Sequence, residues 1–247
     1  MTNHRVDVVI FALALAVFGL VVLALAWSGD WAYAGLARAN GFRGTTFVSH
    51  GPGPSPGPGG DVVEGKEPLT LEELLEWHRL WARYVIGIDS GRPGLDPPRV
   101  YFGRHPFSDE EYAHMAEVRD VFRGAETAAV LALFVGVFRL WRARTRGTAL
   151  RLLRDGGLVS AALVAAVGIA ALLAFDPLFL LFHEVFFPRG NFLFDPATSN
   201  LIRLYPEWYW QGVTAGVGLS FIALALIAAG SAHLVLQSRS TTYTRAA

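Results

Sequence analysis

Two histidines in distant parts of the chain each stand close to carboxylic acids. His114 lies in the segment FSDEEYAHMAEVRDVF, with Glu111 and Glu117 within one helical turn of it. His183 is followed directly by Glu184. An imidazole titrates near neutral pH, and a carboxylate within reach can orient it. These two segments are therefore candidates for general acid–base catalysis.

Several other kinds of catalytic site are not supported. The chain has no cysteine, which excludes a disulfide framework, a zinc–thiolate site and a cysteine acyl-enzyme. His183 and Glu184 are followed by Val-Phe-Phe, which does not complete the HExxH motif of zinc proteases. Neither a P-loop nor a dinucleotide-binding fingerprint occurs. We therefore expect proton-transfer chemistry with no metal and no cofactor.

Four long apolar runs must position these histidines. They cover residues of about 6–27, 125–141, 157–182 and 212–236, in a chain that is 53% hydrophobic. A helix of about 20 apolar residues spans a bilayer. The first run is too long for the apolar part of a signal peptide and lacks a clear cleavage site, so we interpret it as an anchor. The sequence predicts an all-α protein in which 1–247 form a single membrane domain with four transmembrane helices.

The distribution of basic residues predicts the orientation of these spans. The segment between the second and third runs, RLWRARTRGTALRLLRD, carries six arginines against one acid, Asp155. A short loop this basic remains in the cytoplasm. Four alternating spans then place both termini in the cytoplasm. Residues 28–124 and the loop 188–211 therefore face outward together, as a cap of amphipathic helix and loop.

The first part of the outer region contains a linker and an amphipathic helix. Residues 51–60, GPGPSPGPGG, suit a flexible linker. Residues 68–86 contain Thr70 and Glu73 at capping-box spacing, followed by a broad apolar face that leaves His78 on the wet side. This helix is either a packing element over the bundle or a wall for a lipid substrate.

A second helix carries His114 toward the membrane. Ser108 and Glu111 repeat the capping-box spacing, so a helix should begin near Asp109. Nothing breaks this helix clearly before the second span. His114 is therefore expected on an outward extension of that span.

The third apolar run has an unusual end. Asp176 and Pro177 interrupt it, and two interpretations remain open: a functional carboxylate, or an N-cap that restarts a helix. The restarted segment carries His183 to the outer interface. Asp195, also followed by proline, repeats the pattern and predicts a short helix over 197–204.

The outer loop after His183 holds more polar groups than a plain connection needs. They are Arg189, Asn191, Asp195, Asn200, Arg203, Tyr205 and Glu207. Trp208, Tyr209 and Trp210 close the loop and suit an aromatic belt at the membrane surface. The density of polar groups favours a functional surface.

These features resemble one known family, the bacterial lipoprotein intramolecular transacylases (Lit). The resemblance rests on FSDEEYAHMAEVRDVF, on FDPLFLLFHEVFFPRGNFLFDPATSNLIRLYPEWYW and on the four-span layout. It implies a bacterial plasma-membrane enzyme with an outward-facing active site. The implied reaction moves the sn-2 acyl chain of a diacylglyceryl-cysteine lipoprotein to its own cysteine α-amine, giving an N-acyl lyso-lipoprotein. His114 and His183 match the family's two functional histidines.

The type and place of other residues suggest further roles in this reaction. We expect Arg189, Asn191, Asp195, Arg203, Tyr205 and Glu207 to bind substrate, and Glu117, Asp176 and Glu184 to support the histidines. Of these, Asn191, Arg189 and Arg203 are candidate donors to the oxyanion. The family usually has Asp where this chain has Glu117. One histidine would take the amine proton and the other would protonate the glycerol oxygen, but the sequence does not assign these roles.

Two other functions remain possible from the sequence. A non-enzymatic membrane protein could bind a lipid or a partner through the outer loops, and a metal-dependent lipid hydrolase could use the same histidines. The expected partners are diacylated lipoproteins and membrane lipid. The zero net charge implies no nucleic-acid partner. We expect the protein to act as a monomer.

Overall fold

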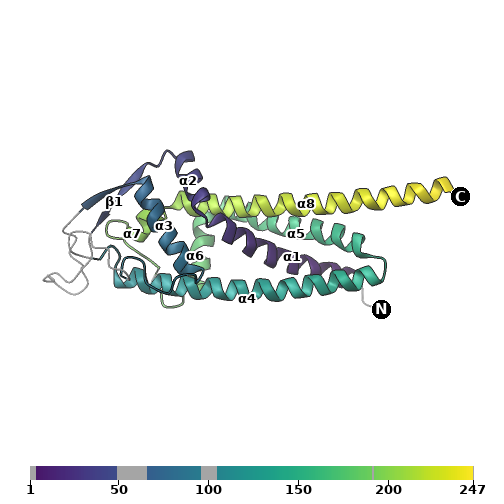
Figure 1. Ribbon diagram of the computed structural model, residues 1–247, viewed down its shortest axis with the longest axis horizontal. Helices are drawn as coiled ribbons and strands as arrows, with labels where there is room; N and C mark the ends of the chain where they lie inside the picture. The colour runs from purple at the N-terminus through teal and green to yellow at the C-terminus, as the bar shows by residue number, and fades with distance from the viewer. Residues whose placement is uncertain (1–3, 49–65, 96–104, 191, 247) are drawn as a thin grey trace. The chain divides into compact units, whose positions relative to one another are not determined.

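The computed structural model of the protein describes residues 4–48, 66–95, 105–190 and 192–246 (Figure 1). The linker 51–60 and Asn191 lie outside these residues. The described helices are α1 (His4–Trp27), α2 (Asp30–Ala39), α3 (Leu71–Val85), α4 (Asp109–Thr145), α5 (Ala149–Leu173), α6 (Phe175–Phe186), α7 (Asn200–Leu204) and α8 (Glu207–Ala246). Strands β1 (Gly44–Val48) and β2 (Lys66–Thr70) pair antiparallel.

The chain divides into two compact units, which are described separately. The bundle unit contains 1–26, 125–175 and 214–247. The histidine unit contains 27–124 and 176–213. Helices α4 and α8 each contribute residues to both units.

Small side chains let the helices of the bundle unit approach closely. Ala16, Ala161 and Ala225 are buried together with Phe221. At Gly157 an added Cβ would lie only 3.0 Å from the Ala225 carbonyl oxygen. Close packing of small residues is the usual means of helix association in a bilayer, where lipid is as apolar as the side chains.

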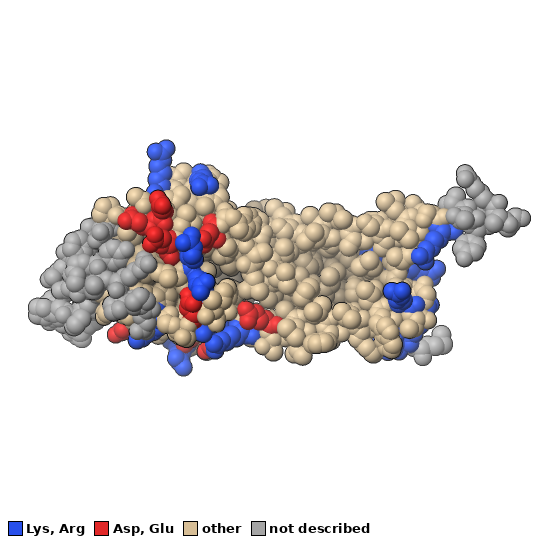
Figure 2. Space-filling view, viewed as in Figure 1, with Lys and Arg blue, Asp and Glu red and all other residues tan. Residues whose placement is uncertain are grey.

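The outer surface of the bundle unit is apolar. Its exposed side chains include Leu131, Phe134, Val137, Val167, Leu172, Leu173, Leu219, Ile227 and Leu234. In Figure 2 the surface along this unit is almost entirely tan, with blue side chains at one end. A water-soluble unit buries such residues, whereas a bilayer accommodates them. The described part of the chain has four helices long and apolar enough to cross a membrane, as the sequence predicted.

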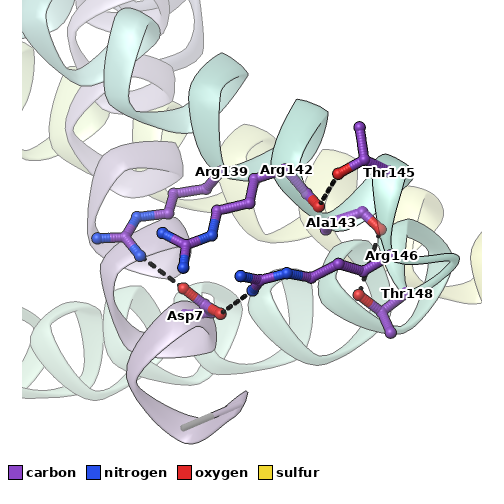
Figure 3. Close-up of polar contacts among 7 residues, drawn as sticks. All are labelled: Asp7, Arg139, Arg142, Ala143, Thr145, Arg146 and Thr148. Atoms are coloured by element: carbon purple, nitrogen blue, oxygen red, sulfur yellow. Dashed lines mark hydrogen bonds and ion pairs between the residues drawn. The ribbon is translucent and has the colours of Figure 1, made fainter. Parts of the chain in front are cut away.

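A network of charged groups lies at the basic end of the bundle unit (Figure 3). Arg139 donates a hydrogen bond to Asp7 at 2.5 Å, and the Arg146 guanidinium lies 3.8 Å from the same carboxylate. Gly147, with a φ of 71°, turns the chain between α4 and α5. The Thr148 hydroxyl then donates to the Ala143 carbonyl and closes this turn.

The third apolar run is divided between two helices, in agreement with the helix-restart interpretation, but the break lies earlier than that interpretation predicted. Helix α5 ends at Leu173 and α6 begins at Phe175, so Asp176 lies in the first turn rather than at the N-cap. Pro177 is the third residue of α6, where its missing N–H leaves no intrahelical bond unmade.

Helix α4 is longer than a membrane crossing requires. Its 37 residues correspond to about 55 Å, whereas the hydrocarbon core of a bilayer is about 30 Å thick. The apolar stretch begins near Ala125, so the polar first turns, with His114, lie outside the membrane-spanning segment. The helix passes through Gly124 without interruption, in agreement with the sequence analysis.

The histidine unit has an aromatic core arranged around α3. Thr70 and Glu73 form the predicted capping box at the start of this helix. Trp77 and Trp81 are buried with Phe107. Strands β1 and β2 also belong to this unit and were not predicted from the sequence. The chain is therefore mostly helical, as predicted, but not entirely so.

The prediction that His78 lies on the wet side of α3 is wrong. His78 is only 2% exposed, and its ring stacks on Tyr33 at 4.7 Å between centroids. Nε2 lies 3.0 Å from the Ser28 carbonyl, which can only accept, so this nitrogen carries the proton and Nδ1 accepts from the Tyr205 hydroxyl at 3.2 Å. Burial lowers the pKa of His78 and keeps it neutral. The apolar face of α3 is wide enough to include this position.

Candidate active site

His114 is fixed by the first turns of α4. The Ser108 hydroxyl accepts from the Glu111 N–H at 3.2 Å, which confirms the second capping box and the start of α4 at Asp109. Tyr112 and Met115 are buried in the aromatic core on either side of His114 in sequence. His114 itself is only 6% exposed. Its ring packs against Phe187, at 4.6 Å between ring centroids.

The buried Glu111 carboxylate connects α4 to the chain before α7. One oxygen accepts from the Ser108 N–H at 2.8 Å. The other accepts from the Ser199 hydroxyl at 2.6 Å and from the Leu201 N–H at 2.7 Å. The capping-box spacing predicted the contact with Ser108 but not the contacts with Ser199 and Leu201. The second set fixes the outer loop against the helix that carries His114.

His183 lies near the end of α6, and its hydrogen bond determines its tautomer. Nδ1 lies 2.7 Å from the Phe179 carbonyl oxygen one turn earlier. A carbonyl oxygen can only accept, so Nδ1 carries the proton in the neutral ring. Nε2 therefore has a free lone pair, which is the arrangement that a general base requires.

The structure brings the two histidines together. Their rings are nearly parallel, with 6.0 Å between centroids and 16° between planes. Phe187 contacts both rings, with 4.6 Å between its ring centroid and that of His114 and 5.2 Å between its ring centroid and that of His183. Phe194 lies 5.5 Å from His114, and Phe192 lies 5.2 Å from His183. The pair thus stands among phenylalanines contributed by the loop after α6.

This apolar environment keeps both imidazoles uncharged. Burial, and to a smaller extent the neighbouring His183, lower the pKa of His114 to about 4. Burial also lowers the pKa of His183, against the opposing effect of the Phe179 carbonyl. At neutral pH both rings can accept a proton, and a proton once accepted is readily given up.

A second contact joins the same two chain segments. Arg189 Nε lies 3.2 Å from Glu117 Oε1. The other carboxylate oxygen of Glu117 is buried and has no hydrogen-bond partner among the described residues, and the same is true of His114 Nδ1. Among the described residues, including those at this site, no cluster of three or more His, Asp or Glu side chains is arranged to hold a metal ion.

The sequence profile of the lipoprotein intramolecular transacylase Lit family matches residues 80–210, which include both histidines and the residues around them. The chain belongs to the Lit family. A protein of Aquifex aeolicus (strain VF5) described as uncharacterized is 28% identical over 163 residues, which are 64% of this chain and 71% of that protein.

Solved structures agree with this Lit assignment at the level of the fold. The in meso structure of the membrane-integral Lit from Bacillus cereus matches with a TM-score of 0.69 and 14% identity, over 97% of this chain and 98% of that one. A histidine-to-arginine variant of that protein matches with a TM-score of 0.68 and 12% identity, over 97% and 94% of the two chains. This Lit-family chain is therefore a multi-pass membrane protein.

Other predicted site residues of this Lit-family chain have local partners. Arg203 donates to the Thr46 carbonyl at 2.6 Å and to the Ala197 carbonyl at 2.9 Å. The Asp195 carboxylate accepts from the Ala197 N–H at 2.8 Å and forms a turn, so that α7 begins at Asn200 rather than at residue 197. Tyr205 is the partner of His78.

The remaining predicted residues do not face the histidine pair through any described contact. Glu207 lies at the start of α8 and accepts a hydrogen bond from Gln211 at 2.5 Å. Glu184 is exposed, and Asp176 is partly buried in the first turn of α6. Of the aromatic belt, Tyr209 is buried in the core of the histidine unit, whereas Trp210 is 38% exposed and donates to the Tyr205 carbonyl.

Asn200 has a structural role in the Lit-family loop that the sequence did not indicate. It is fully buried, accepts from the Val48 N–H at 2.9 Å and donates to the Val48 carbonyl at 2.7 Å. It also donates to the Pro106 carbonyl. Asn200 thus ties β1 and the chain before α4 to α7. No local pattern marks an amide whose partners lie so far away in sequence.

Proposed function

We propose that this chain is itself a lipoprotein intramolecular transacylase. In this reaction the sn-2 acyl chain of the diacylglyceryl group moves to the α-amine of the same N-terminal cysteine. The observation that carries the proposal is the stacked pair of neutral histidines in an apolar environment. Two groups of this kind can serve a transfer in which the substrate brings its own nucleophile, without water or a cofactor.

The hydrogen bond of His183 favours this residue as the general base, an assignment that the sequence left open. The neutral α-amine attacks the sn-2 ester carbonyl, and His183 Nε2 takes one amine proton. The bond between the carbonyl carbon and the glycerol oxygen then breaks, and His183 returns the proton to that oxygen. One N–H bond and one ester bond are lost while one amide and one hydroxyl are gained, so atoms and charges balance.

His114 then acts as a hydrogen-bond donor. Nδ1 of His114 is buried and has no hydrogen-bond partner among the described residues. A buried N–H group without a partner is rarer than a buried acceptor without one. Nδ1 is therefore better assigned as the unprotonated nitrogen, with the proton on Nε2. From Nε2 the ring donates to the oxygen on which negative charge develops. This role replaces the separate proton transfer by a second histidine that the sequence suggested.

The proposed orientation places this site outside the cytoplasm of a bacterial cell. The α4–α5 turn and its flanks are rich in arginine, which supports a cytoplasmic location for that end of the bundle unit and for both termini. The residues of the histidine unit would then lie on the outer side, where diacylated lipoproteins are held in the membrane.

Mass spectrometry of lipoprotein N-termini tests the proposed reaction. The host lacks other N-acylating activity and is compared with and without the gene. We expect N-acyl lyso-lipoprotein only when the gene is present. Unchanged diacylglyceryl-cysteine with a free amine, in a strain that contains the protein in its membrane, would overturn the proposal.

A further inference from the structure

We propose that Glu117 receives the α-ammonium group of the substrate, and that Arg189 occupies this carboxylate when no substrate is bound. The inference rests on the proposed function, because only a substrate with a free N-terminal amine needs such a partner. It assigns a substrate-binding role to a side chain that the sequence analysis expected to support a histidine.

The substrate brings a charge that the apolar site must accommodate. An α-amino group has a pKa of about 8, so most of it is protonated at neutral pH. Moving an unpaired ammonium group from water to a place among phenylalanines is strongly unfavourable. A carboxylate within reach of the histidine pair offsets this cost and holds the amine where it can lose its proton.

Most acids near the histidines are unsuited to this role. Both oxygens of Glu111 already accept hydrogen bonds from Ser108, Ser199 and Leu201. Glu110 and Glu184 are exposed and have no buried oxygen to receive the ammonium group. Glu117 is the acid in this part of the chain that has a buried oxygen without a partner among the described residues.

Glu117 also faces the chain segment that completes the site. It follows His114 by three positions, which places the two side chains on neighbouring parts of one face of α4. His114 contacts His183 and Phe187, and Glu117 contacts Arg189 just beyond them. The carboxylate and the imidazole thus lie against the same stretch of chain.

The contact with Arg189 is suited to exchange. The Arg189 side chain is 78% exposed, whereas that of Glu117 is 18% exposed. An ion pair with so exposed a partner contributes little to stability, so a second cation can displace the guanidinium at small cost. Gly190, with a φ of 73°, turns the chain directly after Arg189. Displacement leaves Glu117 paired with the incoming ammonium group.

The experiment compares two synthetic lipopeptides that share an S-diacylglyceryl cysteine. One has a free α-amine and the other an acetylated α-amine. Their affinities are measured for the full-length protein in the His183→Ala background, so that acyl transfer does not alter the ligand. We expect the free amine to bind at least about tenfold more tightly, equivalent to about 1.4 kcal/mol.

Variants of the two partners should change this preference in opposite directions. Glu117→Gln should remove it and leave the affinity for the acetylated lipopeptide unchanged, and Glu117→Asp should retain it. Arg189→Gln should increase it, because the competing cation is gone. Glu110→Gln, which removes the same charge from an exposed position on α4, should have no effect.

Three results would overturn the inference. The first is a preference for the free amine that is unchanged in Glu117→Gln, and the second is a loss of this preference in Glu110→Gln as large as in Glu117→Gln. The third is an equal loss of affinity for both lipopeptides in Glu117→Gln and Arg189→Gln. The last would mark a merely structural ion pair. Acyl transfer is measured separately with His183 intact. A preference without transfer would contradict the proposed function alone, whereas transfer without a preference would contradict the role of Glu117 alone.

Discussion

At the scale of single residues, the site depends on keeping two imidazoles neutral and differently protonated. The Phe179 carbonyl fixes the proton of His183 on Nδ1, and the packing around His114 leaves its Nδ1 without a donor or acceptor among the described residues. The surrounding phenylalanines then disfavour the charged form of either ring. Two chemically identical side chains are thereby suited to the different roles that we propose for them.

Loss of the proposed base should abolish acyl transfer without removing the protein from the membrane. We expect His183→Ala to lower the single-turnover rate by about 10²–10⁴-fold, the usual contribution of a general base. His233→Ala provides a matched control, because His233 is exposed on α8. The rate is followed by mass spectrometry of a purified diacylated lipoprotein. Near-normal transfer by His183→Ala would contradict the two-histidine mechanism.

The pH dependence of transfer should show one titrating group rather than two. The reactive amine is neutral, so the logarithm of the rate should rise with a slope of one as pH increases from about 5.5 to 7.5. Burial lowers the pKa of His114 to about 4 and also lowers the pKa of His183, so both rings stay neutral to a lower pH than a free histidine does. A histidine with an unshifted pKa would add a second unit of slope below about 6.5. Single-turnover rates across this range distinguish the two cases.

At the scale of elements, one buried carboxylate fixes α4 against the outer loop. Glu111→Ala would leave the buried Leu201 N–H and the Ser108 N–H without this acceptor. Each such loss costs about 1–3 kcal/mol. We expect a lower midpoint of thermal unfolding in detergent than for Ser199→Ala, which removes one donor to Glu111 and the N-cap acceptor of the Ile202 N–H. Equal midpoints for the two variants would show that Glu111 does not have this role.

Helix packing in the bundle unit depends on a close approach at Gly157. Gly157→Ala would place a methyl group 3.0 Å from the Ala225 carbonyl and 3.2 Å from Ala229 Cβ, which forces α5 and α8 apart. Such overpacking costs about 1–3 kcal/mol. Gly168→Ala on the same helix meets nothing within 4 Å and should be neutral or slightly stabilising. Thermal unfolding of both variants tests the difference.

Local patterns predicted some elements, and distant contacts determined others. The capping boxes at Thr70 and Ser108 are complete within four residues, so the starts of α3 and α4 could be predicted. Strands β1 and β2 could not, because their pairing joins residues on either side of the segment 49–65. The width of the apolar face of α3 likewise did not show whether His78 faced the core or water.

The candidate site was predictable by residue type but not by arrangement. The histidines could be selected because each lies beside acids at or beyond the end of an apolar run. Their stacking, the tautomer of His183 and the contact between Glu117 and Arg189 depend on how α4 and α6 meet. Nor does any spacing rule reveal that Asn200 binds the backbone of Val48.

At the scale of the whole molecule, the orientation in the membrane decides whether the histidines can meet their substrate. A basic segment that flanks a span stays in the cytoplasm because its arginines are retained there during insertion. The polar first turns of α4 would then lie on the outer side, where lipoproteins are anchored. The chain has no cysteine, so a single introduced thiol reports its own location.

Labelling of two single-cysteine variants tests this orientation. Glu110→Cys and Thr145→Cys place an exposed thiol near the opposite ends of α4. A membrane-impermeant maleimide should modify Glu110→Cys in intact spheroplasts and Thr145→Cys only after lysis, because the latter residue lies within the arginine-rich segment. The reverse pattern would place His114 and His183 in the cytoplasm, away from anchored lipoproteins, and would rule out the proposed reaction in the cell.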